Sequence, residues 1–309
     1  MSTEPRTGGA QMTIPRLAEM KRAGEPIVMV TAYDFPSAQV AEEAGVDLVL
    51  VGDTAAMTVL GYDSTVPVTM DEMVMLASAV RRGARSSLVI GDLPFGSYQG
   101  SNELAVTSAV RYLKEAGCDA IKLEMAGVSG GVADKRESVA RARSIVAAGI
   151  PVMGHVGLTP QSASALGGYR TQGRTMQQAV QVADDALSLQ DAGCFAIVFE
   201  AVPAAVTEVI MERMRVPVIG IGAGAATDGQ VLVFHDLLGL HEGHTPRFVK
   251  HFAEVKREMV EGVRAYAEDV REGRFPAAEH TYAIEPAELE RFREVIAPGK
   301  PWDAADFMT

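Results

Sequence analysis

The stretch DLVLVGD, residues 47–53, is an apolar run that stops on an acid, Asp53. The same design returns three more times: SLVIGD ends on Asp92, CDAIKLE on Glu124 and CFAIVFE on Glu200. Each run follows an Ala-Gly or Arg-Gly pair, which is typical of the end of a helix. Each acid is therefore predicted to lie where a buried strand leaves the core.

Outward from this stretch, apolar runs alternate with amphipathic segments along most of the chain. Strands are expected at residues 26–34, 47–53, 87–95, 119–124, 151–157, 195–203, 216–224 and 229–238. Helices are expected at residues 13–23, 35–44, 71–82, 102–117, 134–148, 176–192, 204–214 and 246–272, with Asn102 as an N-cap. This alternation favours a (β/α)8 TIM barrel over an open doubly wound sheet, and no GxGxxG follows the first strand.

The chain is predicted to form one catalytic domain with two appendages. Residues 1–12 are polar and are expected to be a flexible N-terminus, and residues 13–280 are expected to form the barrel. Residues 281–309 contain one short helical pattern, EPAELERFREV, and no strand. We therefore expect this C-terminal extension to be a packing or subunit-contact arm rather than a second domain.

Composition limits the classes of function. The 309 residues are 48% hydrophobic and carry a net charge of −12, which disfavours nucleic acid and anionic membrane as partners. The sequence has neither a signal-peptide pattern nor an apolar run of about 18 residues. The two cysteines, Cys118 and Cys194, open strand-like runs and are expected to be buried and free. These features predict a soluble, cytoplasmic protein.

The four strand-end acids should meet on one rim, because a parallel barrel gathers the C-terminal ends of its strands there. Acids brought together repel and need a cation or a shared proton. Side-chain alternation pairs Lys122 with Glu124, Glu200 with Val198 and Asp53 with Val51, and predicts that these acids point into the barrel mouth. The alternative is a structural ion-pair network.

Oxygen ligands from two aspartates suit Mg2+, whereas zinc would favour several histidines or thiolates. A 2-keto acid would chelate such a metal through its carboxylate and carbonyl oxygens, and its enolate would then be stabilised. Glu200 is the candidate general base because it lies on a separate, strongly apolar strand; an ion pair with a loop arginine is the alternative.

Other polar and glycine-rich segments are expected on the same rim. His155 is either a hydrogen-bonded core residue or a group that holds a substrate oxygen. The GIGAG run, residues 220–224, is either a phosphate cradle or a site of tight packing. The long loops at residues 54–70 and 158–175 are expected to be lids or binding loops.

Several motifs together resemble one enzyme family. They are TAYDF, LVGDTAAM, YDSTVPVT, DLPFGSY, IKLE, GHVGLTPQS, LGGYRTQGR, FEAVP and IGIGAGAATDGQVLV, and they span roughly residues 13–280. The chain is similar to the ketopantoate hydroxymethyltransferases (3-methyl-2-oxobutanoate hydroxymethyltransferases). The resemblance implies a Mg2+-dependent barrel that transfers a hydroxymethyl group from 5,10-methylenetetrahydrofolate to 3-methyl-2-oxobutanoate, giving 2-dehydropantoate (ketopantoate) in pantothenate biosynthesis. It also implies a homo-oligomer, often a decamer.

The resemblance assigns roles to individual residues. It implies that Asp53 and Asp92 bind the metal, with Glu124 near it through water, and that Glu200 is the base. The implied substrate-binding residues are Asp53, Thr54, Asp92, Lys122 and His155, with Thr54 and the Asp53 backbone as the carboxylate-binding pair. The sequence departs from the family pattern at Thr54, usually serine, at Met125 and Ala126, usually two glycines, and in the tail after about residue 280.

Two other functions remain open from the sequence. One is a Mg2+-dependent carbon–carbon lyase or aldolase that acts on a related 2-oxo acid. Such lyases commonly use a cysteine on a mobile rim loop, and neither cysteine here occupies one. The other is a non-catalytic barrel that binds a keto acid or serves as an oligomeric scaffold.

Overall fold

A computed structural model describes residues 11–125, 132–163, 167–240 and 246–298. The chain divides into two compact units, Met1–Glu254 and Val255–Thr309. Residues 1–10 of the predicted flexible start, Ala126 and residues 299–309 of the extension lie outside the described residues. The domain limit expected at residue 280 stays a prediction.

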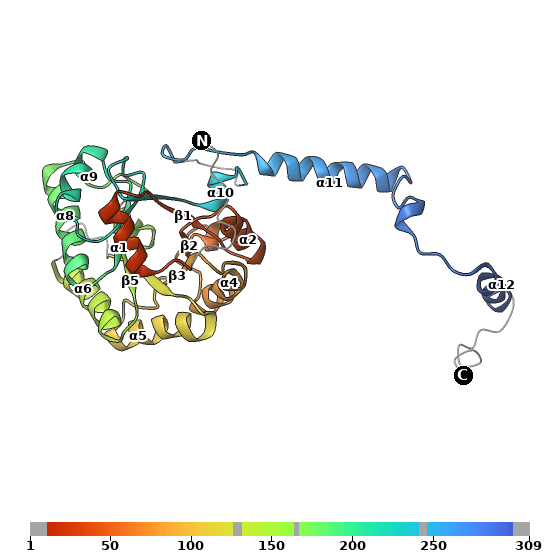
Figure 1. Ribbon diagram of the computed structural model, residues 1–309, viewed down its shortest axis with the longest axis horizontal. Coiled ribbons are helices and arrows are strands. Elements are labelled where there is room, and N and C mark those ends of the chain that lie inside the picture. Colours follow the sequence, from red (N-terminus) through yellow and green to blue (C-terminus); the bar gives the residue numbers. More distant parts are fainter. Residues whose placement is uncertain (1–10, 126–131, 164–166, 241–245, 299–309) are drawn as a thin grey trace. The chain divides into compact units, whose positions relative to one another are not determined.

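The first unit is a closed barrel of eight parallel strands paired in sequence order, β1 to β8, with β8 returning to β1 (Figure 1). The predicted TIM barrel is confirmed. The strands are β1 Ile27–Thr31, β2 Leu48–Val51, β3 Leu88–Asp92, β4 Ala120–Glu124, β5 Val152–Gly157, β6 Ala196–Glu200, β7 Val218–Ile221 and β8 Gly229–Leu232.

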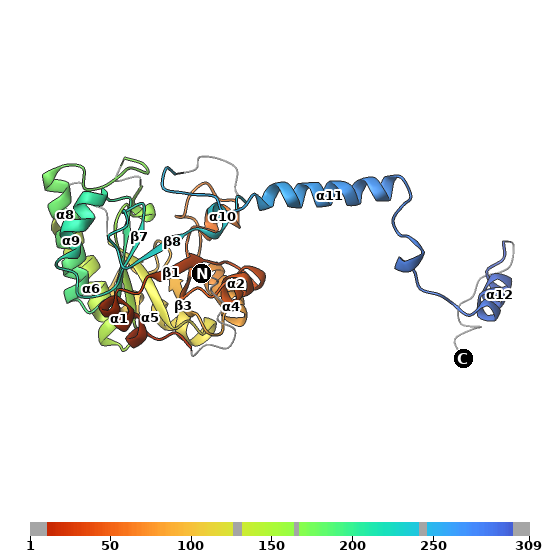
Figure 2. The ribbon, with the colours of Figure 1, turned by 45° about the horizontal axis from the view of Figure 1, so that its top comes forward.

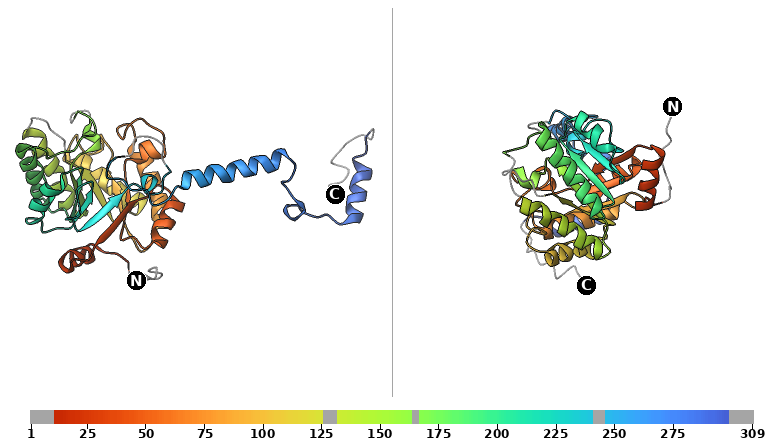
Figure 3. Two further views of the ribbon diagram at one scale, coloured as in Figure 1. Left: turned by 90° about the horizontal axis from the view of Figure 1, so that it is seen from above. Right: turned by 90° about the vertical axis from the view of Figure 1, so that its left-hand side faces the viewer.

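Helices surround the strands, and their order around the barrel can be followed in Figures 2 and 3. The helices of the first unit are α1 Ile14–Ala23, α2 Phe35–Glu43, α3 Ala55–Thr58, α4 Met70–Gly83, α5 Asn102–Arg111, α6 Val132–Ala147, α8 Met176–Asp191, α9 Ala204–Met211 and α10 Phe234–Leu237. A π-helix, η1 Tyr112–Ala116, extends α5, and a 3-10 turn, η2 Pro160–Ser162, follows β5. Within the described residues, no helix is long and apolar enough to cross a membrane.

Alternation along the strands builds two apolar layers. Ala120 of β4 and Val198 of β6 belong to the barrel interior, which α1 closes with Leu17 and Met20. Ile121 and Leu123 belong to the layer between strands and helices. Lys122 and Glu124 therefore share the inward parity of Ala120, as predicted.

Local signals explain where several helices begin. In α4, Thr69 Oγ1 accepts a hydrogen bond from the Glu72 amide at 3.2 Å, while the Glu72 carboxylate accepts one from the Thr69 amide at 2.7 Å. This capping box satisfies two amides that the helix leaves unpaired. The predicted cap of α5 was wrong by one residue, because Ser101 Oγ accepts from the Leu104 amide at 3.1 Å and Asn102 is the first helical residue.

Three expected elements differ from the structure near the end of the barrel. The strand expected at residues 216–224 is limited to Val218–Ile221, and residues 222–228 link it to β8 without a helix. The run at residues 229–238 is a strand only as far as Leu232, after which it turns into α10. The helix expected over residues 246–272 begins at Val255, because residues 246–254 adopt turns and bends.

The second unit contains α11 Val255–Arg271, a 3-10 turn, η3 Ala278–His280, and α12 Pro286–Val295. α11 has no buried residue. Met259, Val263, Tyr266 and Val270 recur at helical spacing and are 58%, 68%, 58% and 46% exposed. We call these four residues the α11 stripe.

Candidate active site

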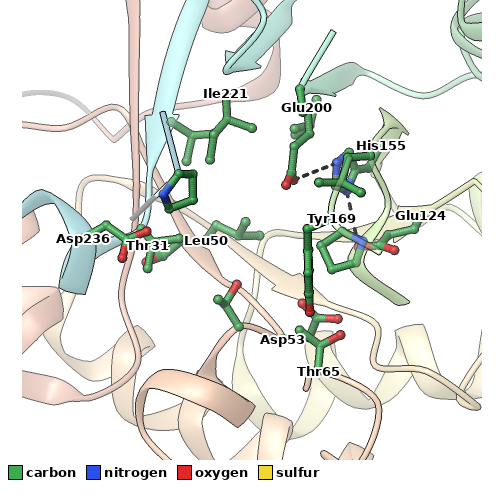
Figure 4. Close-up of a pocket in the computed structure, with 18 of the residues that line it drawn as sticks. Thr31, Leu50, Asp53, Thr65, Glu124, His155, Tyr169, Glu200, Ile221 and Asp236 are labelled. Carbon is green, nitrogen blue, oxygen red and sulfur yellow. Dashed lines mark ion pairs between the residues drawn. The ribbon is translucent and has the colours of Figure 1, made fainter. Parts of the chain in front are cut away.

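All the sequence-predicted site residues line one cavity of about 510 Å³ at the C-terminal end of the strands (Figure 4). They are Asp53, Thr54, Asp92, Lys122, Glu124, His155 and Glu200. Strand register explains why they meet. Asp92 pairs with Lys122 across β3 and β4, Glu124 with His155 across β4 and β5, and Gly157 with Glu200 across β5 and β6.

Lys122 is the central cation of the site and is 4% exposed. Its Nζ lies 2.9 Å from Asp92 Oδ1, 3.9 Å from Glu124 Oε1 and 3.4 Å from His155 Nδ1. Burial lowers the pKa of Lys122, but the surrounding carboxylates, Asp92 first, raise it above its ordinary value. Lys122 therefore stays charged.

His155 connects two acids on either side of it. Nδ1 lies 3.5 Å from Glu124 Oε1, and Nε2 lies 3.2 Å from Glu200 Oε2 (Figure 4). Burial and Lys122 lower the pKa of His155, but the adjacent carboxylates of Glu124 and Glu200 outweigh them and raise it to about 9. His155 is thus a buried polar residue in contact with the candidate base, and its role in holding a substrate oxygen stays a prediction.

Asp53 reaches the site by a different route from the one predicted. Val51 packs in the layer facing the helices, so strand parity did not aim Asp53 inward. The strand ends at Val51, and the turn that follows places Asp53 in the cavity. The Asp53 amide donates to Asp92 Oδ2 at 3.0 Å, so this N–H, implied by the resemblance to hold the substrate carboxylate, is already engaged.

The buried acids carry more negative charge than the adjacent cations balance. Asp53, Asp92, Glu124 and Glu200 face Lys122 and His155, four acids against two bases. Burial, followed by the charges of Asp92 and Glu124, raises the pKa of Asp53 well above its usual range. Burial likewise raises the pKa of Asp92. A divalent cation would neutralise this excess.

The donor set fits a hard divalent cation. Within the described part of the chain, no three His, Cys, Asp or Glu side chains form a pre-built metal cage. Mg2+ does not require one, because it commonly binds one or two carboxylates and keeps water or substrate oxygens. Among the described residues, buried Glu124 Oε1 makes only long contacts, to Lys122 at 3.9 Å and to His155 at 3.5 Å, which leaves this oxygen available to such an ion or its water.

The backbone around Glu200 is unusual. Ala201, which follows it, has φ 50°, and it alone among the described non-glycine residues has a positive φ. Gly157 on the neighbouring strand has φ 93°, and a Cβ there would lie 2.2 Å from the Glu200 carbonyl oxygen. The strand therefore ends in a tight, left-handed turn directly after the candidate base.

The other rim predictions are resolved by packing. In the GIGAG run, a Cβ on Gly222 would lie 2.5 Å from the Phe248 ring and one on Gly224 would lie 2.6 Å from Ala204 Cβ, which supports the tight-packing interpretation.

Cys118 and Cys194 are buried and free, as predicted, and burial raises the pKa of each thiol to about 12.

Sequence reasoning missed several residues of this site. Gln161 and Tyr98 are buried and hydrogen-bonded to one another beside the acids. Thr65 lines the cavity with a buried hydroxyl that has no hydrogen-bond partner among the described residues, and Tyr169 stands at the opening, 56% exposed. Gln161 lies in the GHVGLTPQS motif, where a polar residue just after a strand end is the signal that would have found it.

Several solved structures share the fold at low sequence identity. Phosphonopyruvate hydrolase, in a complex with oxalate and Mg2+, matches with a TM-score of 0.56 at 16% identity, over 93% of this chain and 98% of that one. Oxaloacetate acetylhydrolase, in complex with the product oxalate, matches with a TM-score of 0.58 at 12% identity, over 92% and 94%. These likenesses concern the fold alone.

Sequence relatives are much closer. The 3-methyl-2-oxobutanoate hydroxymethyltransferase of Carboxydothermus hydrogenoformans is 50% identical over 91% of this chain and 99% of its own length. The enzyme of that name from Moorella thermoacetica is 52% identical over 88% and 98%. The one from Oleidesulfovibrio alaskensis is 46% identical over 96% and 99%, so that alignment continues past residue 280.

The family comparison covers the barrel. A family model described as ketopantoate hydroxymethyltransferase matches residues 11–278. This range includes every strand and every acid of the cavity. The chain therefore belongs to the ketopantoate hydroxymethyltransferase family.

Proposed function

We propose that this chain transfers a hydroxymethyl group from 5,10-methylenetetrahydrofolate to 3-methyl-2-oxobutanoate, giving 2-dehydropantoate in pantothenate biosynthesis. One observation carries the proposal: Glu200 and the buried acids Asp53, Asp92 and Glu124 line the same cavity. This arrangement sets a proton acceptor opposite an oxygen-rich site for a chelated keto acid. The identity of the acceptor and donor rests on membership of the family.

Asp53 and Asp92 would hold Mg2+, with Glu124 close to it. The ion would acidify the C–H next to the substrate carbonyl by stabilising negative charge on the substrate oxygens. The chain's own residues position this chemistry. Lys122, held 2.9 Å from Asp92, supplies a fixed positive charge, and the hydroxyl of Thr54 is available to a substrate carboxylate at the cavity wall.

Glu200 would remove the proton from C3 of the keto acid. His155 Nε2 lies 3.2 Å from Glu200 Oε2, and this contact would orient the carboxylate. Leu50, Val198 and Ile221 line the same cavity and offer an apolar wall to the isopropyl group of the substrate. The wall explains how the site would accept a branched 2-keto acid.

The open end of the cavity suits the folate donor. Tyr169 and Arg247 both line the cavity, and Tyr169 is 56% exposed. An aromatic ring can stack on a pterin, and a guanidinium can pair with the carboxylates of the glutamate tail. These residues are our candidates for contacts with the donor.

Proton exchange at C3 tests the function directly. We expect the protein, with Mg2+ and 3-methyl-2-oxobutanoate deuterated at C3, to wash out deuterium in the absence of folate. We expect 2-dehydropantoate to form only when 5,10-methylenetetrahydrofolate is added. Exchange without folate-dependent product would favour the carbon–carbon lyase, and no exchange would favour a non-catalytic barrel.

Glu200→Gln tests the assignment of the base. The amide cannot accept the proton, so exchange should fall by about 100-fold or more. Binding of the keto acid in the presence of Mg2+, followed by calorimetry, should change little. Glu208→Gln, at an exposed position of α9, is the matched control and should exchange at the wild-type rate. Equal exchange by Glu200→Gln and the wild type would refute the assignment.

We further propose that the protein is a homo-oligomer, with a decamer as the expected form, and that it works in the cytoplasm. The α11 stripe supports assembly, because four large apolar side chains on one helix face are exposed in the isolated chain. Another copy of the chain would bury them, which gives α11 a role in subunit contact. We propose the same role for the C-terminal extension, residues 281–309, which follows α11 in the second unit. Buried free thiols are consistent with a reducing compartment.

A further inference from the structure

One residue outside the proposed catalytic set contacts two of the candidate metal ligands. Gln161 belongs to the 3-10 turn η2, directly after β5, and is 7% exposed. Its side-chain Nε2 donates to Asp53 Oδ2 at 3.0 Å. Its backbone amide donates to Glu124 Oε2 at 3.0 Å. Gln161 thus links by hydrogen bonds two acids that lie at the ends of β2 and β4.

The remaining hydrogen bonds of the Gln161 side chain fix its orientation. Nε2 also donates to the Leu93 carbonyl at 2.9 Å. Oε1 accepts from the Tyr98 hydroxyl at 2.8 Å and from Gln99 Nε2 at 3.2 Å. Both donors and both lone pairs of the amide are therefore used. A flipped amide would turn its oxygen towards the Leu93 carbonyl and its NH2 group towards Gln99 Nε2, so the NH2 group must face Leu93 and Asp53.

Gln161 engages one oxygen of each acid, Asp53 Oδ2 and Glu124 Oε2, and makes no hydrogen bond to the second oxygen of either. Within the residues that the structure describes, Glu124 Oε1 makes only long contacts, 3.5 Å to His155 Nδ1 and 3.9 Å to Lys122 Nζ. A carboxylate with one oxygen anchored can present only the second oxygen in a fixed direction. Groups that hold metal ligands in this way commonly change metal affinity by about 10- to 100-fold when they are removed.

We propose that Gln161 is a positioning residue that orients Asp53 and Glu124 for a divalent cation. The proposal rests on the metal-dependent function proposed above. It gives a role to the Gln of the GHVGLTPQS motif, which the proposed chemistry otherwise leaves without one. Tyr98 supports the arrangement from the loop after β3, because its hydroxyl holds Oε1 of Gln161.

Gln161→Met tests the proposal, because methionine keeps the length of the side chain and removes its hydrogen-bonding groups. Mn2+ is the probe, and its free concentration is followed by electron paramagnetic resonance in a titration of the substrate-free protein. We expect Mn2+ affinity to fall by about 10- to 100-fold. We also expect the exchange rate to recover towards the wild-type value at saturating metal, because the base Glu200 is untouched.

Two further variants separate positioning from general damage. Gln190→Met removes an equally buried amide, whose Oε1 accepts from the Arg215 amide at 2.6 Å ahead of β7, at the opposite end of the barrel. It should bind Mn2+ like the wild type. Tyr98→Phe removes only the hydroxyl that holds Gln161, and it should weaken Mn2+ binding in the same direction but by less. Tyr98→Phe keeps the test available if Gln161→Met does not fold.

The outcomes of the titration are distinct. Wild-type affinity in Gln161→Met and in Tyr98→Phe, or an equal loss in Gln190→Met, would overturn the role of Gln161. If the wild-type protein binds no Mn2+, the metal-dependent function proposed above would be contradicted instead. Loss in Gln161→Met and Tyr98→Phe, with Gln190→Met unchanged, would support the inference.

Discussion

At the scale of single residues, Asp53 shows how burial and charge make this site depend on a cation. The residue is 3% exposed, and burial with the neighbouring Asp92 and Glu124 raises its pKa well above the usual range. The ionised form is therefore costly in the metal-free fold at any pH above the unfolded-state pKa of about 3.9. The ordinary preference of an aspartate for its charged form is restored only when a cation is present.

Metal binding should therefore grow stronger as the pH rises beyond the range in which an ordinary aspartate, with a pKa of about 3.9, loses its proton, because the Asp53 proton must leave when the ion binds. An aspartate with an ordinary pKa would already be ionised throughout that higher pH range. Calorimetric titration with Mg2+ in two buffers of different ionisation enthalpy would measure the protons released.

Asp63→Asn, at an exposed position, should release the same number of protons as the wild type. Asp53→Asn should lose both the proton release and most of the affinity. An affinity for Mg2+ that is constant over this pH range, with no proton released, would contradict the role given to Asp53.

At the scale of secondary-structure elements, strand β3 and the π-helix η1 are fitted to each other. A Cβ on Gly91 would lie 2.4 Å from Cδ1 of Tyr112, the first residue of η1. The Tyr112 hydroxyl in turn donates to the Asp92 carbonyl. Glycine is therefore required here by close approach of a ring, and the same contact fixes the end of the strand that carries a candidate metal ligand.

Gly91→Ala should lower the free energy of unfolding by about 1–3 kcal/mol, because the added methyl group overpacks the contact with Tyr112. Urea denaturation followed by circular dichroism would measure the change. Gly262→Ala, within α11 and with no atom near its added Cβ, is the control and should be neutral or slightly stabilising. A Gly91→Ala protein as stable as the wild type would show that η1 can shift freely.

The sequence predicted the elements better than it predicted the contacts between them. The strand-end acids could be predicted because alternation and helix-ending glycines are local signals. These signals also predicted correctly that Lys122 and Glu124 point into the barrel. Strand parity failed for Asp53, because Val51 faces the helices and Asp53 enters the cavity through the turn after the strand. Gln161 was missed because its partners are distant in sequence, and only the closed barrel brings η2 next to β2 and β4.

At the scale of the whole molecule, the second unit differs from the first in what it buries. The barrel has continuous apolar layers, whereas α11 has no buried residue and exposes its stripe. An amphipathic pattern predicted this helix, but the pattern does not say which surface its apolar face contacts. We interpret that face as a surface for another copy of the chain.

Val263→Asp should therefore reduce the assembly to smaller species, because a carboxylate would be buried in the subunit contact. Light scattering coupled to size-exclusion chromatography would give the mass. Ala265→Asp introduces the same residue on the opposite, exposed side of α11 and should leave the mass unchanged. If the Val263→Asp protein has the wild-type mass, the α11 stripe is not part of the subunit contact.

The left-handed residue beside Glu200 bears on any attempt to make this protein more heat-resistant. The left-handed conformation of a non-glycine residue lowers the stability of the fold by about 1–2 kcal/mol. Ala201→Gly would therefore be an attractive substitution if thermostability were the only criterion. The same exchange would loosen the peptide that aims the proton acceptor. Thermostability and catalytic turnover therefore compete at this position, so a variant selected for one should also be assayed for the other.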